Sequence, residues 1–183
     1  MSELLLQTRN LTKQYGRHRA VDDVNMHIKK GAIYGFIGRN GAGKTTCLKM
    51  ISGLSTPSYG EIEMFGYKGK DLQKVRSRVG CLIEAPGLYV NMSAYDNLNI
   101  KCKLTGIKKK GYIEELLKTV GLDTVGEKKT KHYSLGMKQR LGIALALVGE
   151  PDLLILDEPI NGLDPQGIVE GRETIQKLSL IHI

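Results

Sequence analysis

Eight consecutive residues, GRNGAGKT at positions 38–45, have the types and the spacing that bind a phosphate chain. They match the pattern G-x-x-x-x-G-K-[ST] in full. Glycines allow the backbone to curl so that its N–H groups bind an anion, and we expect a helix to begin near Gly43 with its positive end toward the phosphates. The Lys44 ammonium is expected to reach the β- and γ-phosphates, and the Thr45 hydroxyl to bind Mg²⁺. The residues expected to contact the nucleotide are Gly38, Asn40, Gly41, Ala42, Gly43, Lys44, Thr45 and Thr46.

A second group that can do chemistry is the acidic pair Asp157–Glu158, which directly follows the apolar run LLIL at residues 153–156. A buried parallel strand presents ligand-binding groups at its carboxyl end. We expect Asp157 to hold Mg²⁺ through water, and Glu158 to orient or deprotonate an attacking water. The alternative for Asp157 and Glu158 is an acidic turn at the end of a strand, without a catalytic role. The alternative for residues 38–45 is a glycine-rich turn that contains a lysine by chance.

The elements that must position these groups alternate between strand and helix. This alternation predicts an α/β fold with a mainly parallel sheet and helices on both faces. A basic helical stretch from Ser93 to about Val125 interrupts it, and we interpret that stretch as an inserted helical subdomain that begins at a capping box, Ser93 to Asp96. The expected strands are 4–10, 20–28, 32–37, 61–65, 79–83 and 153–156. The expected helices are 43–54, 70–78, 135–148 and 165–178, besides those of the insert.

Composition narrows the class of protein. The chain has 183 residues and a formal charge of +8, enough for one domain with a real core. No apolar stretch approaches the roughly 20 residues of a membrane span, and the start lacks the features of a signal peptide. Cys47, Cys81 and Cys102 form no CxxC pair, which predicts free thiols. The lysines between residues 101 and 131 indicate an anionic partner or a solvated face, and few aromatic residues accompany them, so no nucleic acid is expected.

The segment YSLGMKQR at residues 133–140 resembles the L-S-G-G-Q signature of ATP-binding-cassette (ABC) transporter subunits. Ser134 and Gly136 match this signature, whereas Leu135 and Met137 depart from it. The resemblance implies that Ser134, Gly136 and Met137 contact the γ-phosphate bound by an opposite subunit, at a helix N-terminus. The alternative for Ser134 is a helix N-cap and nothing else.

Further positions follow the family in order. Asn161–Asp164 resembles the D-loop, which implies that Asn161 and Asp164 lie at a dimer interface. Tyr15 is at the position of an aromatic that stacks on adenine; the alternative is a turn aromatic packed on the sheet.

Glu84 stands where most ABC ATPases have a glutamine. At this position, and in the segment NMSAYDNLN at residues 91–99, the chain resembles the bacitracin and lantibiotic export or immunity ATPases. The resemblance implies a catalytic and metal-binding role for Glu84, with a surface glutamate as the alternative.

The resemblance implies a P-loop NTPase core with a parallel sheet, an N-terminal antiparallel β subdomain and an inserted α-helical subdomain. It divides a single ABC-type domain into a core (1–92 and 150–183) and a helical part (93–149). It implies ATP as substrate and Mg²⁺ as cofactor. The implied partners are a second copy of the chain, transmembrane permease subunits and anionic lipid head groups. The implied location is cytoplasmic, on the inner face of the membrane through the permease.

The family carries a switch histidine on a late strand, and His182 lies too close to Asp164 to fill that role. We therefore expect a C-terminally truncated domain that binds ATP and hydrolyses it poorly. Two other functions stay open: a soluble ABC-type ATPase that acts on ribosomes or DNA, and a nucleotide-binding fragment without turnover. The sequence does not name the transported substrate, because membrane subunits choose it.

Overall fold

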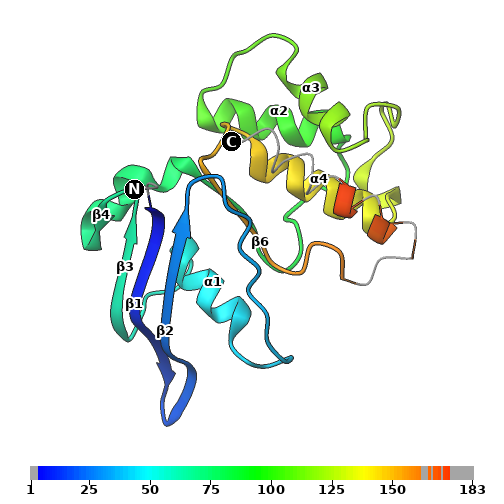
Figure 1. Ribbon diagram of the computed structural model, residues 1–183. Coiled ribbons are helices and arrows are strands. Elements are labelled where there is room, and N and C mark those ends of the chain that lie inside the picture. Colours follow the sequence, from blue (N-terminus) through cyan, green and yellow to red (C-terminus); the bar gives the residue numbers. More distant parts are fainter. Residues whose placement is uncertain (1–3, 162–164, 166, 170, 174–183) are drawn as a thin grey trace. The chain divides into compact units, whose positions relative to one another are not determined.

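A long antiparallel hairpin opens the part of the chain that the computed structural model describes, which comprises residues 4–161, 165, 167–169 and 171–173. Strands β1 (Leu4–Tyr15) and β2 (His18–Lys29) are joined by a tight turn at residues 16–17, and both are longer than predicted. β3 (Tyr59–Met64) pairs with the other edge of β1, and the short β4 (Tyr67–Lys68) pairs with β3. The sheet order is β2-β1-β3-β4, and each of these pairings is antiparallel (Figure 1).

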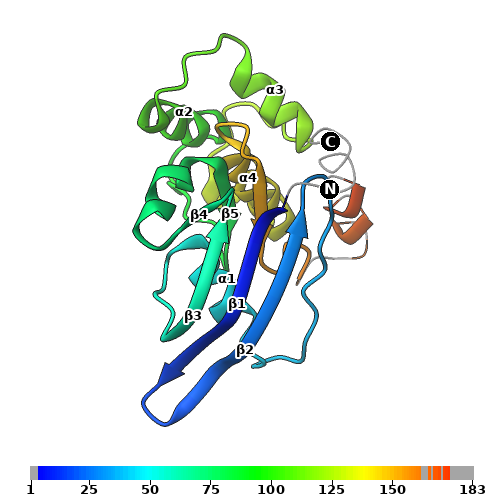
Figure 2. The ribbon, with the colours of Figure 1, turned by 60° about the vertical axis from the view of Figure 1, so that its left-hand side comes forward.

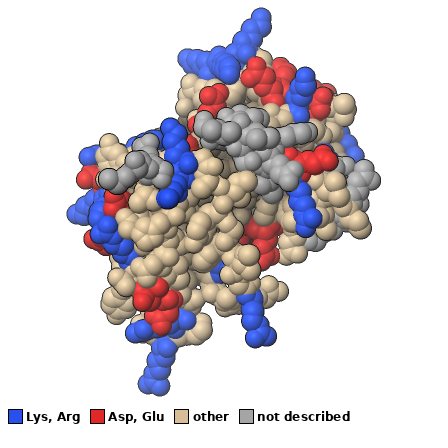
Figure 3. Space-filling model, in the orientation of Figure 1, with Lys and Arg blue, Asp and Glu red and all other residues tan. Residues whose placement is uncertain are grey.

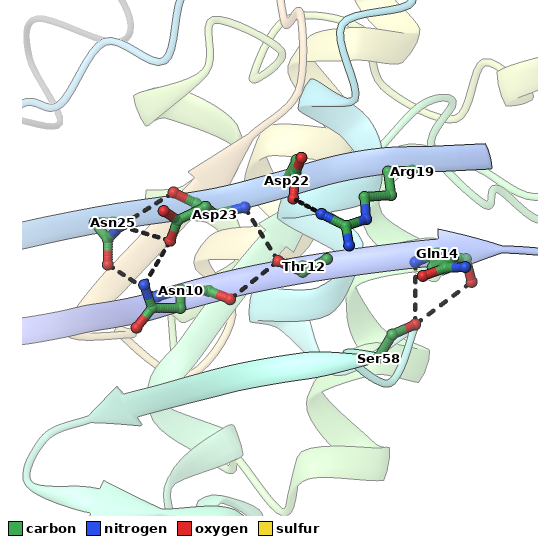
Figure 4. A network of polar contacts seen from close by, with 8 residues as sticks. All are labelled: Asn10, Thr12, Gln14, Arg19, Asp22, Asp23, Asn25 and Ser58. Carbon is green, nitrogen blue, oxygen red and sulfur yellow. Dashed lines mark hydrogen bonds and ion pairs between the residues drawn. The ribbon is translucent and has the colours of Figure 1, made fainter. Parts of the chain in front are cut away.

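Side chains satisfy the backbone where the β1–β2 ladder is irregular (Figure 4). The register shifts between Thr8 and Leu11, and Asn10 and Asp23 have positive φ angles of 50° and 53°. The Asn10 N–H donates to Asn25 Oδ1 over 2.8 Å, and the Asp23 N–H donates to the Thr12 hydroxyl over 3.1 Å. These bonds replace the missing rungs of the ladder, as expected at a β-bulge.

Helix α1 (Lys44–Ser52) covers this antiparallel sheet and contacts β1 and β2. It buries Cys47, Met50 and Ile51. The predicted polar helix before β5 is a 3₁₀-type segment, η1 (Gly69–Arg78), that buries only Leu72 and Val75. Burial of these side chains supplies the hydrophobic stabilisation of this part of the chain.

A second compact unit begins at Gly80, next to the first residue of β5 (Val79–Leu82). β5 pairs with β6 (Leu153–Leu156). The Asp157 N–H donates to the Leu82 carbonyl over 2.8 Å. Because that bond joins the carboxyl ends of both strands, β5 and β6 run parallel.

Helices α2 (Ala94–Thr105), α3 (Tyr112–Thr119) and α4 (Leu135–Leu147) pack against one another in this second unit (Figure 2). A short 3₁₀ turn, η2 (Thr130–His132), leads into α4. The predicted capping box at α2 is confirmed: Ser93 Oγ accepts from the Asp96 N–H, and the Asp96 side chain accepts from the Ser93 N–H. The core that these helices share includes Leu98, Val120, Leu122, Leu141 and Ile143.

The expected fold class is confirmed as mixed α/β, with an antiparallel sheet, a parallel pair and helices. One predicted strand is wrong. Residues 32–37 pair with no strand in the described part of the chain, and Ile37 is 94% exposed. A strand needs a neighbour to bond its backbone groups, so an apolar run alone does not form one.

The domain boundaries at residues 92, 93, 149 and 150 stay a prediction. The described residues of the expected last helix, 165, 167–169 and 171–173, are helical. None of the helices in the described ranges has the length and apolar character that a membrane crossing needs.

Candidate nucleotide-binding site

The phosphate-loop segment turns sharply into α1. Gly41 and Gly43 have φ angles of 81° and 84°, and Gly43 is the N-cap of the helix, as predicted. A Cβ on Gly43 would lie 2.0 Å from the Ala20 carbonyl oxygen of β2, so only glycine fits this position. The Ala42 N–H donates to the Arg39 carbonyl over 3.0 Å and closes the turn.

The Lys44 ammonium folds back over this loop. Its Nζ donates to the carbonyl oxygens of Gly38 and Arg39, over 3.0 and 3.2 Å. Thr45 and Thr46 are half-buried in the first turn of α1, where the structure has no acidic residue and no side-chain cap. A cation and an uncapped helix N-terminus therefore lie on one short segment, which is an arrangement that attracts anions.

Tyr15 ends β1 opposite His18, and its side chain is 54% exposed. The Lys13 ammonium lies 5.1 Å from the centre of its ring. An exposed ring with a cation on one face is able to stack on a base.

The acidic residues follow the two parallel strands of the second unit at equivalent places. Glu84 lies two residues after the end of β5, and Glu158 lies two residues after the end of β6. Both are exposed and both have a positive φ, 62° for Glu84 and 46° for Glu158. Residues other than glycine rarely adopt this left-handed conformation, and those that do cluster in turns and at functional sites.

Asp157 directly precedes Glu158 and is only 6% exposed. Its carboxylate, that of Glu84 and the Thr45 hydroxyl are all oxygen donors, which are the ligands that Mg²⁺ prefers. The donor types thus fit the predicted metal. Within the described ranges, no three His, Cys, Asp or Glu side chains gather into a metal-binding group, and Thr45 belongs to the first compact unit whereas Asp157 belongs to the second.

Ser134 is the N-cap of α4, because its Oγ accepts from the Met137 N–H over 3.2 Å. The capping role is thus observed, and the predicted contact with a phosphate is compatible with it. Gly136 and Met137 lie in the first turn of the helix and are half-buried, while Leu135 is 49% exposed. Asp164 and His182 lie outside the described residues.

Two buried polar side chains were not indicated by any motif. Asn97 is 2% exposed and Thr130 is 0% exposed, and both bond to the loop after Glu84. Because both lie in segments with many polar residues, nothing in their type or spacing indicates that they are buried. Next to Ser134, the Tyr133 hydroxyl and the Gln139 Oε1 are buried without a hydrogen-bond partner among the described residues, and burial raises the pKa of Tyr133.

The three cysteines are free, as predicted, and burial raises the pKa of Cys47 to about 11. Lys109 pairs with Glu115 and Glu150, over 3.5 and 3.6 Å. On the face shown in Figure 3, Lys and Arg side chains project at several separate places, with Asp and Glu among them.

Comparison with known protein families gives one assignment. Residues 21–161 match the ABC transporter family, a range that contains the phosphate loop, Glu84, Ser134 and the acidic pair. The chain belongs to the ABC transporter family.

Individual ABC transporter proteins are also similar to it. The bacitracin transport ATP-binding protein BcrA of Enterococcus faecalis is 52% identical, over 97% of this chain and 58% of the relative. The lantibiotic transport ATP-binding protein SrtF of Streptococcus pyogenes is 47% identical, over 94% of this chain and 74% of the relative. A dimeric structure of the ATP-binding cassette MJ0796, in a post-hydrolysis state bound to ADP and Pi, has a TM-score of 0.81 and 26% identity, over 96% of this chain and 83% of that one. The chain spans about 58% of the length of the BcrA relatives it matches.

Proposed function

We propose that this chain is the ATP-binding and ATP-hydrolysing subunit of an ABC transporter that exports a peptide antibiotic or confers immunity to one. The observation that carries the proposal is the phosphate loop: Lys44 folded over the carbonyls of Gly38 and Arg39, at the uncapped N-terminus of α1. In this arrangement an arriving triphosphate exchanges the weak contacts of the ammonium with neutral carbonyls for stronger contacts with its charged oxygens.

The proposed chemistry is in-line attack of water on the γ-phosphate of ATP, which yields ADP and inorganic phosphate. Lys44 binds the β- and γ-phosphates, Tyr15 stacks on the adenine, and Glu158 orients the water and accepts its proton. Thr45, Asp157 and Glu84 would hold Mg²⁺. When bound, the metal neutralises charge that develops on the phosphate oxygens.

The proposed partners follow from the family. A second copy would supply Ser134, Gly136 and Met137 to the γ-phosphate, with Asn161 and Asp164 at the interface. The dimeric structure of the MJ0796 cassette supports the formation of a dimer. Transmembrane permease subunits would place the chain at the cytoplasmic face of the membrane. The loop after Glu84 suits such docking, because Tyr89, Val90 and Met92 are 55%, 50% and 40% exposed. The lysines between residues 101 and 131 suit anionic lipid head groups.

The peptide-antibiotic assignment rests on the relatives BcrA and SrtF and on Glu84. A carboxylate in place of the usual glutamine adds a negative charge next to the strand ends that carry the acidic pair. We expect it to hold Mg²⁺ more strongly than the neutral amide. The cargo itself would be chosen by the membrane subunits.

Nucleotide binding by the Lys44→Ala variant tests the proposal. We expect the affinity for Mg-ATP, measured with a fluorescent ATP analogue, to fall by more than about tenfold, which corresponds to about 1.4 kcal/mol. The matched control is Lys49→Ala, which removes a lysine from the last turn of the same helix and should leave the affinity unchanged. Equal affinities of the two variants would refute the assignment of the loop.

Hydrolysis by the Glu158→Gln variant tests the assigned base. The amide keeps the size of the side chain and cannot accept the proton of water, so we expect binding to persist while turnover falls by about 10²–10⁴. Phosphate release under single-turnover conditions measures this step. Turnover equal to that of the unmodified chain would remove Glu158 from its role.

A further inference from the structure

Two buried side chains converge on one backbone carbonyl in the loop that follows Glu84. The Thr130 hydroxyl donates to the Tyr89 carbonyl over 3.1 Å, and the Asn97 side-chain amide donates to the same oxygen over 3.2 Å. Asn97 also accepts from the Tyr89 N–H over 2.8 Å and donates to the Ser93 carbonyl over 2.8 Å. Asn97 is therefore bonded on both sides of its amide, and it fixes Tyr89 to the start of α2.

Two backbone hydrogen bonds join the same two segments. The Thr130 N–H donates to the Met92 carbonyl over 2.9 Å, and the Lys131 N–H donates to the Val90 carbonyl over 2.9 Å. We call these bonds, with the two from Thr130 and Asn97 to Tyr89, the Thr130 tether. The tether joins residues 89–92, five residues after Glu84, to residues 130–131, three residues before Ser134.

The loop after Glu84 also contacts the helix that Ser134 caps. A Cβ on Gly142 of α4 would lie 2.8 Å from the Pro86 Cβ and 2.9 Å from a methyl group of Leu82. Because α4 approaches this closely, the loop touches it at Gly142 and is bonded to the segment before it at Thr130. Packed interiors transmit a displacement and do not absorb it. A shift of the loop is thus passed to the N-terminus of α4.

We propose that Thr130 is a positioning residue that couples the Glu84 loop to Ser134, so that nucleotide and metal bound near Glu84 set the position of the signature helix α4. The proposal rests on the proposed function, because it needs a ligand at Glu84. Thr130 touches neither substrate nor metal in this role. It acts because its hydroxyl, which is fully buried, holds the two segments in one register.

Hydrogen exchange of the full chain tests the coupling. The measurement compares the chain with and without Mg²⁺ and a non-hydrolysable ATP analogue, at a concentration where sedimentation shows a monomer. In the unmodified chain we expect the ligand to slow exchange both at residues 38–46 and at residues 133–139. In Thr130→Val, which keeps the shape and removes the hydroxyl, residues 38–46 should respond as before. The ligand effect at residues 133–139 should fall by about 2- to 30-fold, the range of coupling that intermediate residues carry.

Two further variants exclude a general loss of structure. Thr130→Ser restores the hydroxyl and should restore the response at residues 133–139. Thr119→Val removes a hydroxyl that bonds to the Glu115 carbonyl over 2.8 Å within α3, outside the tether, and should leave the response unchanged. Should Thr130→Val fail to fold, Thr130→Cys keeps a weak donor of similar size and should give an intermediate response.

Three results would overturn the coupling: an unchanged response at residues 133–139 in Thr130→Val, an equal loss in Thr119→Val, or no recovery in Thr130→Ser. A different result overturns the proposed function, and the coupling with it: no ligand effect at residues 38–46 of the unmodified chain. The two failures are distinguishable because they appear at different residues.

Discussion

The side-chain amide of Asn161 donates a hydrogen bond of 2.8 Å to Oε2 of Glu158, and the Asn161 N–H donates to the Glu158 carbonyl over 3.0 Å. The turn after β6 is thereby closed by the same residue that orients the carboxylate. The family resemblance placed Asn161 at a dimer interface. The structure adds a contact within the chain that bears on the proposed base.

We predict that Asn161→Ala lowers kcat by about 10- to 100-fold, as is usual for a residue that orients a ligand or base without touching the substrate. KM for ATP should stay the same, because the phosphate loop is untouched. Steady-state phosphate release measures both parameters. An unchanged kcat would show that the bond to Glu158 has no role in turnover.

Gly43→Ala should destabilise the chain more than Gly41→Ala does. Both positions have φ angles above 80°, so alanine is strained by about 1–2 kcal/mol at either one. At Gly41 nothing lies within 4 Å of the added Cβ, whereas at Gly43 it meets the Ala20 carbonyl at 2.0 Å. Urea unfolding measures the difference. Equal unfolding free energies would mean that β2 moves away from the loop at little cost.

Tyr133→Phe and Tyr112→Phe should differ in stability although both remove one buried hydroxyl. The Tyr112 hydroxyl donates to the Leu147 carbonyl over 3.3 Å and accepts from the Gly149 N–H over 3.0 Å. Its removal deletes both bonds, although the Leu147 carbonyl keeps the bond it accepts from the Glu150 N–H over 3.0 Å, and should cost about 0.5–1.5 kcal/mol. The Tyr133 hydroxyl has no partner among the described residues, so its removal should be nearly neutral. Thermal and urea unfolding of both variants check this order.

Alkaline pH should destabilise the chain through the same two phenols. Burial raises the pKa of Tyr112 and of Tyr133 above their ordinary value of 10.0. The unfolded chain therefore loses these protons first, and the stability present below pH 10 declines as the pH rises through the raised values. We expect the decline of the unfolding free energy as the pH rises above 10 to be shallower in either Tyr→Phe variant. Parallel curves for the variants and the unmodified chain would contradict this assignment.

Features fixed by local chemistry could be predicted from the sequence. The capping box from Ser93 to Asp96, the start of α1 at Lys44 and the N-cap at Ser134 depend on residues within one turn of each other. β6 and the acidic pair after it could also be predicted, because a short apolar run bounded by polar residues is typical of a buried parallel strand.

Features that depend on a distant partner could not be predicted. Residues 32–37 have the composition of a strand, yet strand formation needs a neighbour that composition does not supply. Asn97 and Thr130 belong to segments with many polar residues, and only the fold brings both to the Tyr89 carbonyl. The bond between Asn161 and Glu158 likewise depends on how tightly the chain turns after β6.

The left-handed backbone at Glu84 and Glu158 has a consequence for how this protein responds to selection. Glycine occupies that conformation at no steric cost, so it would relieve strain at either position while deleting the carboxylate. A library screened for heat resistance alone should accumulate glycine at both sites. The same library screened for ATP hydrolysis should retain the acids. Comparing the residues recovered at positions 84 and 158 in the two screens would separate the requirement for stability from the requirement for activity.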